Sequence, residues 1–364
     1  MDLYSLIREI FNQKVLWEYK PETTHWGDIF NADYCHDFVE SYFGQAQTLA
    51  EPDSLAGVLQ EDHFREIDSN RYQHIVFTFF LGLVIYHNCA TIKSAIDAKF
   101  CDAGEYENAL EKHKKAPFAY LWFLICLFHD LGYQFENNNK NIDGIATFEE
   151  LRNHVTLKEY GNCIKYLDEL KGVPDYFTFD LIANYYKFRN AEMHKIDHGI
   201  IGGMYLFRDL CSIREENYKK TDEVKKGWWK TELEDIFRLA SSIVLCHNIF
   251  LPDAKDYDTY RNYGLGKLKE LAENASKFSI YPFKMEDYPI FFLFCLVDTL
   301  EPIKVVKNVD FLKHIIWDFQ DECLVVKSEL KCGCHYKIMK NASSLSNWLC
   351  NTSIKENGEI KISF

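Results

Sequence analysis

Long apolar stretches, each interrupted by a few polar residues, dominate the middle of the chain. Their length and composition predict helices that are buried on most sides. The clearest are RYQHIVFTFFLGLVIYHN (71–88), PFAYLWFLICLFHD (117–130), LEDIFRLASSIVLCHN (233–248) and DYPIFFLFCLVDTLEP (287–302). A fifth, KIDHGIIGGMYLFRDL (195–210), reads as a helix with a polar start.

The remaining segments are more polar and predict smaller elements. DLYSLIREIFNQ (2–13) has the spacing of an amphipathic helix. We expect further helical stretches at 146–170 and 178–189, an exposed charged excursion at 212–230 and a polar connection at 251–288. Near the C-terminus, CLVVKSEL (323–330) and IKISF (360–364) resemble strands, with KCGCHYK (331–337) as a turn between them.

These elements predict a mainly α protein, a helical body with a small α+β tail. The change along the chain from mixed helices and loops to long apolar helices, and then to strand-like segments, predicts three regions. They are an N-terminal helical extension (1–60), a helical domain (61–304) and a C-terminal segment (305–364).

Composition and charge narrow the class of protein. With 364 residues, of which 47% are hydrophobic, the chain can build a substantial core. A net charge of −14 weighs against extended nucleic-acid binding, which needs clustered Lys and Arg. The sequence shows no signal-peptide pattern and no apolar run long enough for a membrane span. Cysteines such as Cys126, Cys246 and Cys295 lie in apolar runs, as buried reduced thiols do. We therefore expect a cytoplasmic protein with reduced thiols, and the oligomeric state stays open.

Each strongly apolar helix carries a polar residue that could ligate a metal. A lone His on such a helix is more often a hydrogen-bonded core residue, but a buried Asp is costly without a partner. Imidazole and carboxylate side chains suit divalent transition metals, and six of them exceed what one tetrahedral ion needs. The candidate ligands, for two metal ions, are His74, His129, Asp130, His198, His247 and Asp298.

Other candidate sites in the sequence are weaker. His87 competes with His74 as the first ligand, and the His36-Asp37 pair lacks a long apolar helix before it. Trp228-Trp229 could stack on a nucleic-acid base, but a pair of tryptophans more often packs in an apolar interface between elements. The Cys332-Gly-Cys334-His335 cluster is incomplete as a zinc site, which favours a turn.

The ordered ligand set resembles the HD-domain superfamily of metal-dependent phosphohydrolases over residues 71–302. The matching motifs are Arg71-Tyr-Gln-His74, His129-Asp130-Leu-Gly132, Asp197-His198-Gly199 and Asp298-Thr-Leu-Glu301-Pro302. The presence of both His198 and His247 is similar to members with two metals. The resemblance implies an HD-type helical bundle and two divalent ions drawn from Fe, Mn, Mg, Co, Ni or Zn.

The resemblance also implies roles for single residues. Asp130 would bridge the metals, with His74, His129 and Asp298 on one and His198 and His247 on the other. Arg71 precedes the first ligand, as in the family.

Next to these ligands, Asp197 would orient a ligand or cap its helix, and Glu301 would orient a ligand or a water. Many members of the family have a Lys where this chain has Tyr133. Another cation is therefore expected to contact the phosphate, and the candidates are Lys195, which we prefer, and Arg208.

The expected function is hydrolysis of a nucleotide or related phosphoester by a metal-activated hydroxide. Three alternatives stay open. Diiron oxygenases of the same superfamily share the ligand order, a nuclease would need a basic strip beside the metals, and a non-enzymatic binding module would have lost metal binding.

Overall fold

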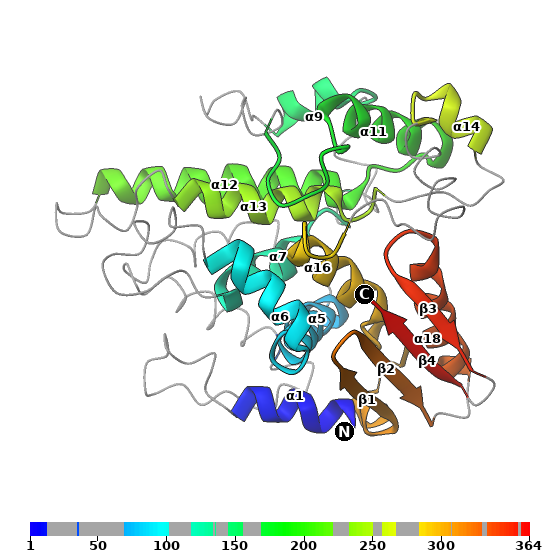
Figure 1. Cartoon of the computed structure of the whole chain (residues 1–364). Coiled ribbons are helices and arrows are strands. Elements are labelled where there is room, and N and C mark those ends of the chain that lie inside the picture. The colour runs from blue at the N-terminus through cyan, green and yellow to red at the C-terminus, as the bar shows by residue number, and fades with distance from the viewer. Residues whose placement is uncertain are drawn as a thin grey trace. The chain divides into compact units, whose positions relative to one another are not determined.

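A computed structural model describes most of the helical body and the C-terminal segment. The described residues are 1–12, 35, 69–101, 118–133, 135, 145–155, 169–220, 233–249, 257–266, 284–306, 308–329, 333–355 and 358–364. Within them the chain is mainly helical, with one small antiparallel sheet formed by residues 315–363 (Figure 1). The predicted fold class, mainly α with a small α+β tail, is confirmed.

The chain divides into two compact units that are interleaved along the sequence. Unit 1 contains Met1–Phe38, Ser69–Asp102 and Leu271–Phe364, and unit 2 contains Val39–Asp68 and Ala103–Glu270. The sheet therefore belongs to the same unit as the N-terminal helix and the first long apolar helix. The three-part division predicted from the sequence stays a prediction.

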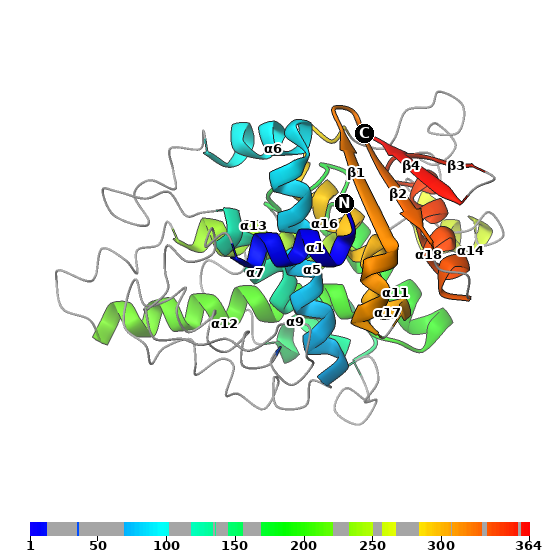
Figure 2. The ribbon, with the colours of Figure 1, turned by 90° about the horizontal axis from the view of Figure 1, so that it is seen from below.

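Unit 1 is built around two apolar helices far apart in sequence, α5 (Ser69–Asn88) and α16 (Pro289–Leu300), which contact each other. Nearly every residue from Tyr72 to Ile85 on α5 is buried, as the apolar run predicted. The predicted amphipathic helix is α1 (Leu3–Asn12), which lies against α5 with Phe11 and Phe80 ring centroids 5.9 Å apart (Figure 2).

A sharp bend follows α5. Cys89 has an extended backbone and separates α5 from α6 (Ala90–Ile96), which continues as a π-helix, η3 (Asp97–Cys101). Tyr86 donates a hydrogen bond to Asp97, and Lys93 contacts both side chains, so the end of α5 is tied to η3. Among the described residues no single helix is long and apolar enough to cross a membrane; α5 and the segment after it pass that test only as a pair bent by 100°.

The C-terminal part of unit 1 contains short helices and the sheet. Pro289 starts α16, which suits a residue without an N–H, and α17 (Ile303–Val306) and η9 (Val309–His314) follow. The four strands are antiparallel in the order β1-β2-β4-β3. They are β1 (Ile315–Gln320), β2 (Cys323–Ser328), β3 (Asn351–Ile354) and β4 (Glu359–Ser363).

The link between β2 and β3 differs from the sequence-based expectation. The predicted turn at KCGCHYK is wrong, because α18 (Gly333–Ser344) begins inside it and is followed by η10 (Leu345–Asn347). Ile338 and Ala342 form the buried side of α18, which contacts α16. The spacing of these two apolar residues is helical, and it outweighs the local Cys-Gly-Cys signal.

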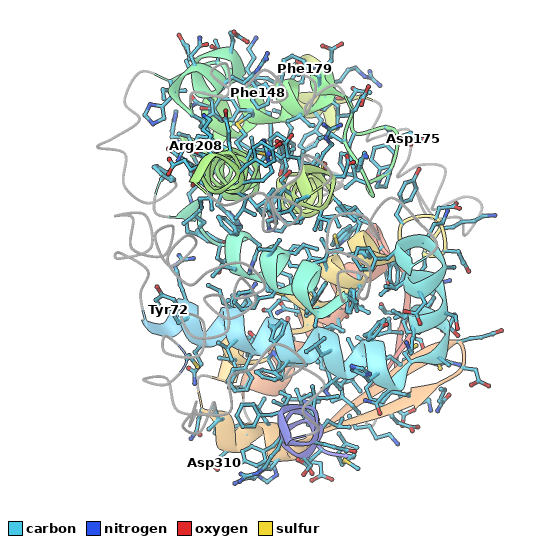
Figure 3. All side chains as sticks on the ribbon, turned by 90° about the vertical axis from the view of Figure 1, so that its left-hand side faces the viewer. Tyr72, Phe148, Asp175, Phe179, Arg208 and Asp310 are labelled. Atoms are coloured by element: carbon cyan, nitrogen blue, oxygen red, sulfur yellow. The ribbon has the colours of Figure 1, made fainter. Side chains whose placement is uncertain are left out.

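Unit 2 is helical in its described residues. Its helices are α7 (Phe118–Phe128), α9 (Phe148–His154), α11 (Phe179–Met193), α12 (His198–Lys220), α13 (Leu233–Cys246) and α14 (Tyr257–Asn262). The long helices α12 and α13 run side by side (Figure 1). Elsewhere in unit 2, α9 packs on α11 through Phe148 and Phe179, whose ring centroids are 5.4 Å apart (Figure 3).

The excursion expected over 212–230 is instead helical in its first half, because α12 continues through Lys220, although Glu216, Tyr218 and Lys219 are exposed as expected. Arg214 is buried and pairs with Glu234 of α13 at 2.7 Å. A buried ion pair therefore links the two helices, and neither charge is left unpaired. The second half of that segment, with Trp228 and Trp229, lies outside the described residues, as does His36-Asp37.

Candidate metal centre

The His129-Asp130 pair follows the last residue of α7 directly. The backbone N–H of His129 still donates to the carbonyl of Ile125 at 3.1 Å, so the ring sits in the last helical turn. His129 is fully buried and Asp130 almost so. The Nε2 atom of His129 lies 3.3 Å from Oδ1 of Asp130.

The ring of His129 is oriented by its own helix. Its Nδ1 lies 2.6 Å from the carbonyl oxygen of Cys126, three residues earlier. A carbonyl oxygen only accepts, so Nδ1 carries the proton and donates it. Nε2 is then the unprotonated nitrogen, the form in which imidazole binds a metal.

His247 repeats this arrangement at the end of α13. Its Nδ1 lies 2.6 Å from the carbonyl oxygen of Val244, again three residues earlier, and the residue is buried. The ring centroids of His129 and His247 are 6.0 Å apart. Two helices of unit 2 therefore end next to each other in histidines with the same tautomer.

His198, the first residue of α12, is the third buried histidine of unit 2. Its ring centroid is 5.4 Å from that of His247. Its ring has different contacts from those of His129 and His247. It stacks on the ring of Tyr133, with centroids 3.6 Å apart and an interplanar angle of 19°. Its Nε2 lies 2.8 Å from the side-chain nitrogen Nδ2 of Asn248. Asn248 directly follows His247, and the sequence did not single it out.

The residue before His198 caps the helix. Oδ1 of Asp197 accepts the backbone N–H of Ile200 at 3.1 Å, and its other oxygen lies 3.6 Å from Nε of Arg189. Asp197 is fully buried, so this pairing offsets the cost of burying its charge. Of the two roles expected for Asp197, capping is the one that these contacts support.

Glycines allow the three helix ends to approach. A Cβ on Gly132 would lie 2.0 Å from the carbonyl oxygen of His198, and one on Gly199 would lie 2.8 Å from Cε1 of His247. A Cβ on Gly202 would lie 2.8 Å from the carbonyl of Phe128. The glycines around the His-Asp pair and in DHGIIGG are thus required by close packing at the site.

In unit 1, His74 on α5 is buried among carboxylates. Its Nδ1 lies 2.8 Å from Oε2 of Glu301, and Thr78 contacts the same nitrogen at 3.3 Å. Its Nε2 lies 3.4 Å from Oδ1 of Asp298. With Nδ1 donating to the carboxylate, Nε2 is again the nitrogen available to a metal. The competing candidate, His87, lies at the other end of α5, where it is half-buried and burial lowers its pKa.

Glu301 and Asp298 occupy the end of α16. Glu301 is buried, and it also accepts the backbone N–H groups of Ile303 at 2.6 Å and Lys304 at 3.2 Å. Asp298 is partly exposed, and its Oδ1 lies 2.5 Å from Nζ of Lys304. The sequence did not identify Lys304 as part of the site.

Three cationic residues singled out in the sequence lie as follows. Arg71 is half-buried on α5, one turn before His74, and the side chain of Lys195 is exposed in the connection before α12. Arg208, half-buried on α12, pairs with Asp209 at 2.5 Å and lies over the ring of Tyr205 at 4.3 Å (Figure 3).

The donor groups fit a divalent metal. Two ligand atoms about 2.1 Å from one ion lie about 3.0 Å apart at a right angle and about 3.4 Å apart at the tetrahedral angle. The Nε2-to-carboxylate distances of 3.4 Å at His74 and 3.3 Å at His129 match that range. By type and burial, His74, His129 and Asp130 could together hold a metal ion.

Thiols do not extend this donor set. Cys126, Cys246 and Cys295 are buried, as predicted, and none of the described cysteines forms a disulfide. Burial, with a smaller contribution from Asp197, raises the pKa of Cys246 well above its ordinary value. Cys246, next to His247, is therefore a neutral thiol.

Comparisons of the chain with protein-family models, curated proteins and solved structures found no match. The mainly helical fold and the buried His and Asp donors are compatible with an HD domain. The finer assignment rests on the sequence motifs and on the geometry above.

Proposed function

We propose that this chain is a metal-dependent phosphohydrolase of the HD type, acting on a nucleotide or a related phosphoester. The observation that carries the proposal is the protonation pattern of three histidines. In His74, His129 and His247, Nδ1 donates to a fixed acceptor and Nε2 is left for a metal. For His74 and His129 that nitrogen also lies next to a carboxylate, which supplies the negative charge that a cation requires.

The proposed ligands are His74, His129, Asp130, His198, His247 and Asp298. Bound metal would lower the pKa of a coordinated water and polarise a phosphoryl oxygen. Glu301 holds the proton of His74 on Nδ1, and the carbonyls of Cys126 and Val244 do the same for His129 and His247.

His198 has a second task in this proposal. Its ring is held between Tyr133 and Asn248, and His198 would have to give up the Asn248 contact to ligate a metal. Tyr133 is thereby a positioning residue for His198. A phenol at this position gives no cation, so the phosphate must be contacted by another residue.

Metal content and phosphate release test the proposal together. The protein purified with metal should contain about two ions per chain. In a screen it should release phosphate from a nucleotide, or open a cyclic dinucleotide to a linear product that chromatography detects. The double variant His129→Ala/Asp130→Ala should lose both the metal and the activity. His314→Ala, at an exposed histidine of unit 1, is the matched control and should keep both.

Two outcomes would overturn the assignment. Full metal content and activity in the double variant would remove the centre from this position. Oxygen uptake with a tightly bound iron pair, and no phosphate release, would favour the oxygenase chemistry that uses the same donors.

A further inference from the structure

One carboxylate oxygen in unit 1 is contacted by both a candidate ligand and a lysine. Oδ1 of Asp298 lies 3.4 Å from Nε2 of His74 and 2.5 Å from Nζ of Lys304. The lysine also lies 3.3 Å from the backbone carbonyl of Asp298. The ammonium group and the imidazole therefore both contact the carboxylate oxygen that we propose as a metal ligand.

The backbone around Lys304 is fixed by the same residue that orients His74. Glu301 accepts the N–H groups of Ile303 and Lys304 while its Oε2 accepts from His74. The first turn of α17 is thus held by a buried carboxylate, and Lys304 starts from a fixed point six residues after Asp298.

The side chain of Lys304, in contrast, reaches solvent. It is 39% exposed, whereas that of Asp298 is 21% exposed and that of Glu301 is fully buried. A lysine has a flexible four-carbon stem and a compact charge, so its head group can move without displacing the backbone. Lys304 can therefore leave Asp298 toward solvent.

We propose that Lys304 contacts the phosphate of the substrate, and that its ion pair with Asp298 competes with metal binding at that carboxylate. This inference rests on the proposed function. A divalent ion bound at Oδ1 of Asp298 would repel an ammonium group at such short range. The displaced ammonium group is then stabilised by the anionic phosphate, as a charge-assisted hydrogen bond.

Lys304 supplies the positive charge that Tyr133 does not. The guanidinium of Arg208 is engaged with Asp209 and Tyr205, and Tyr133 itself stacks on His198. Lys195, the candidate from the sequence, is the competing residue, and the same experiment separates the two.

The test measures two affinities in Lys304→Met, which keeps the apolar stem and removes the charge. Calorimetric titration with Mn²⁺ alone should show binding tightened roughly fivefold, because a partly exposed competing ion pair is removed. Titration of the Mn²⁺-loaded protein with inorganic phosphate should show binding weakened about tenfold, from loss of a charge-assisted hydrogen bond. A purely structural role would weaken both.

Three comparisons complete the design. Lys304→Arg should restore most of the phosphate affinity, and Lys313→Met, which removes an exposed Lys–Asp pair in the same unit, should change neither affinity. Unchanged phosphate binding in Lys304→Met, or a tenfold loss in Lys195→Met instead, would overturn the proposal. Phosphate binding needs no turnover, so this result is distinct from a failure of the proposed function, which would appear as wild-type protein that binds Mn²⁺ and phosphate but hydrolyses no phosphoester.

Discussion

At the scale of single residues, the fixed protonation of the histidines is the property on which the chemistry depends. A neutral histidine whose Nδ1 donates to a carbonyl or carboxylate has its lone pair on Nε2, the nitrogen that can bind a metal. His129 and His247 obtain this from their own helices, three residues back, whereas His74 obtains it from a residue 227 positions away. Two of the three therefore keep their tautomer as long as their helix is intact.

We predict that Glu301→Gln lowers metal affinity by about 10- to 100-fold, the usual effect of removing a group that orients a metal-binding histidine. The amide can still accept from His74, but it removes the negative charge and offers a competing donor. Calorimetric titration with Mn²⁺ measures the effect. Glu322→Gln, at an exposed carboxylate of the same unit, should bind as the wild type does, and equal affinities for both variants would contradict the role of Glu301.

A second prediction concerns the ring stacked on His198. Tyr133→Phe keeps the stack and should keep the metal content, whereas Tyr133→Ala removes it and should lower the bound metal by one ion per chain. Elemental analysis of the two purified variants measures this. If the alanine variant retained full metal content, Tyr133 would not position His198.

All six candidate ligands were recognisable in the sequence, because a carboxylate or imidazole is conspicuous inside an apolar run. The contacts of Asn248 and Lys304 were not, since a polar residue just after a helix end is common and carries no signal of its own. Asn248 contacts His198, 50 positions away, and Lys304 contacts Asp298, six positions away, and neither side-chain contact can be read from local pattern.

At the scale of helices, the glycines of α12 set how closely it approaches α13. A Cβ on Gly199 would lie 2.9 Å from the carbonyl of Val244, and one on Gly203 would lie 2.7 Å from Cβ of Leu245. Gly199 faces His247 as well, so helix packing and the orientation of a candidate ligand depend on the same position.

We expect Gly203→Ala to destabilise the protein by about 1–3 kcal/mol, the usual cost of overpacking, less the gain in helix propensity. Urea denaturation measures it. Gly333→Ala is the matched control, since a Cβ there meets nothing within 4 Å, and it should be neutral or slightly stabilising. A Gly203→Ala variant as stable as this control would show that α12 and α13 can separate without cost.

The contacts between α5 and η3 should make stability depend on pH in alkaline solution. Burial, together with the hydrogen bond to Asp97, raises the pKa of Tyr86 from 10.0 to about 12. The fold thus favours the neutral phenol, so this stability is present below about pH 10 and is lost as the pH rises toward about 12. Tyr86→Phe should flatten the alkaline decrease in unfolding free energy, and identical pH profiles for both proteins would contradict the assignment.

The long helices were predictable because an apolar run of this length is too long for a typical buried strand and is typical of a buried helix. The extent of α12 was not, since its charged second half looks solvated and yet Arg214 pairs with Glu234 of the neighbouring helix. Strands β1 and β3 were also missed. The sequence NTSI of β3 is polar and mostly exposed, so the strand exists through its pairing with β4, which no local pattern reveals.

At the scale of the whole molecule, the candidate ligands are divided between two units. If they form one centre, as we propose, metal should stabilise both units together. At about 100 times the dissociation constant, binding should add about 2.7 kcal/mol. Hydrogen exchange in α5 and in α13, with Mn²⁺ and after its removal by a chelator, measures each unit separately. Protection gained in only one helix would mean that the two ligand sets do not share a metal.

The interleaving of the two units has a consequence for the order in which they can form during synthesis. Residues 103–270 of unit 2 are made before α16, but α5 is made long before the helix it packs against. Until residue 300 has left the ribosome, the apolar surface of α5 lacks its contact with α16. A nascent chain with such a surface is prone to aggregation and suited to chaperone binding. Unit 1 can therefore be completed only after α16 has been synthesised. The contacts of His74 with Asp298 and Glu301 form at that stage and not before.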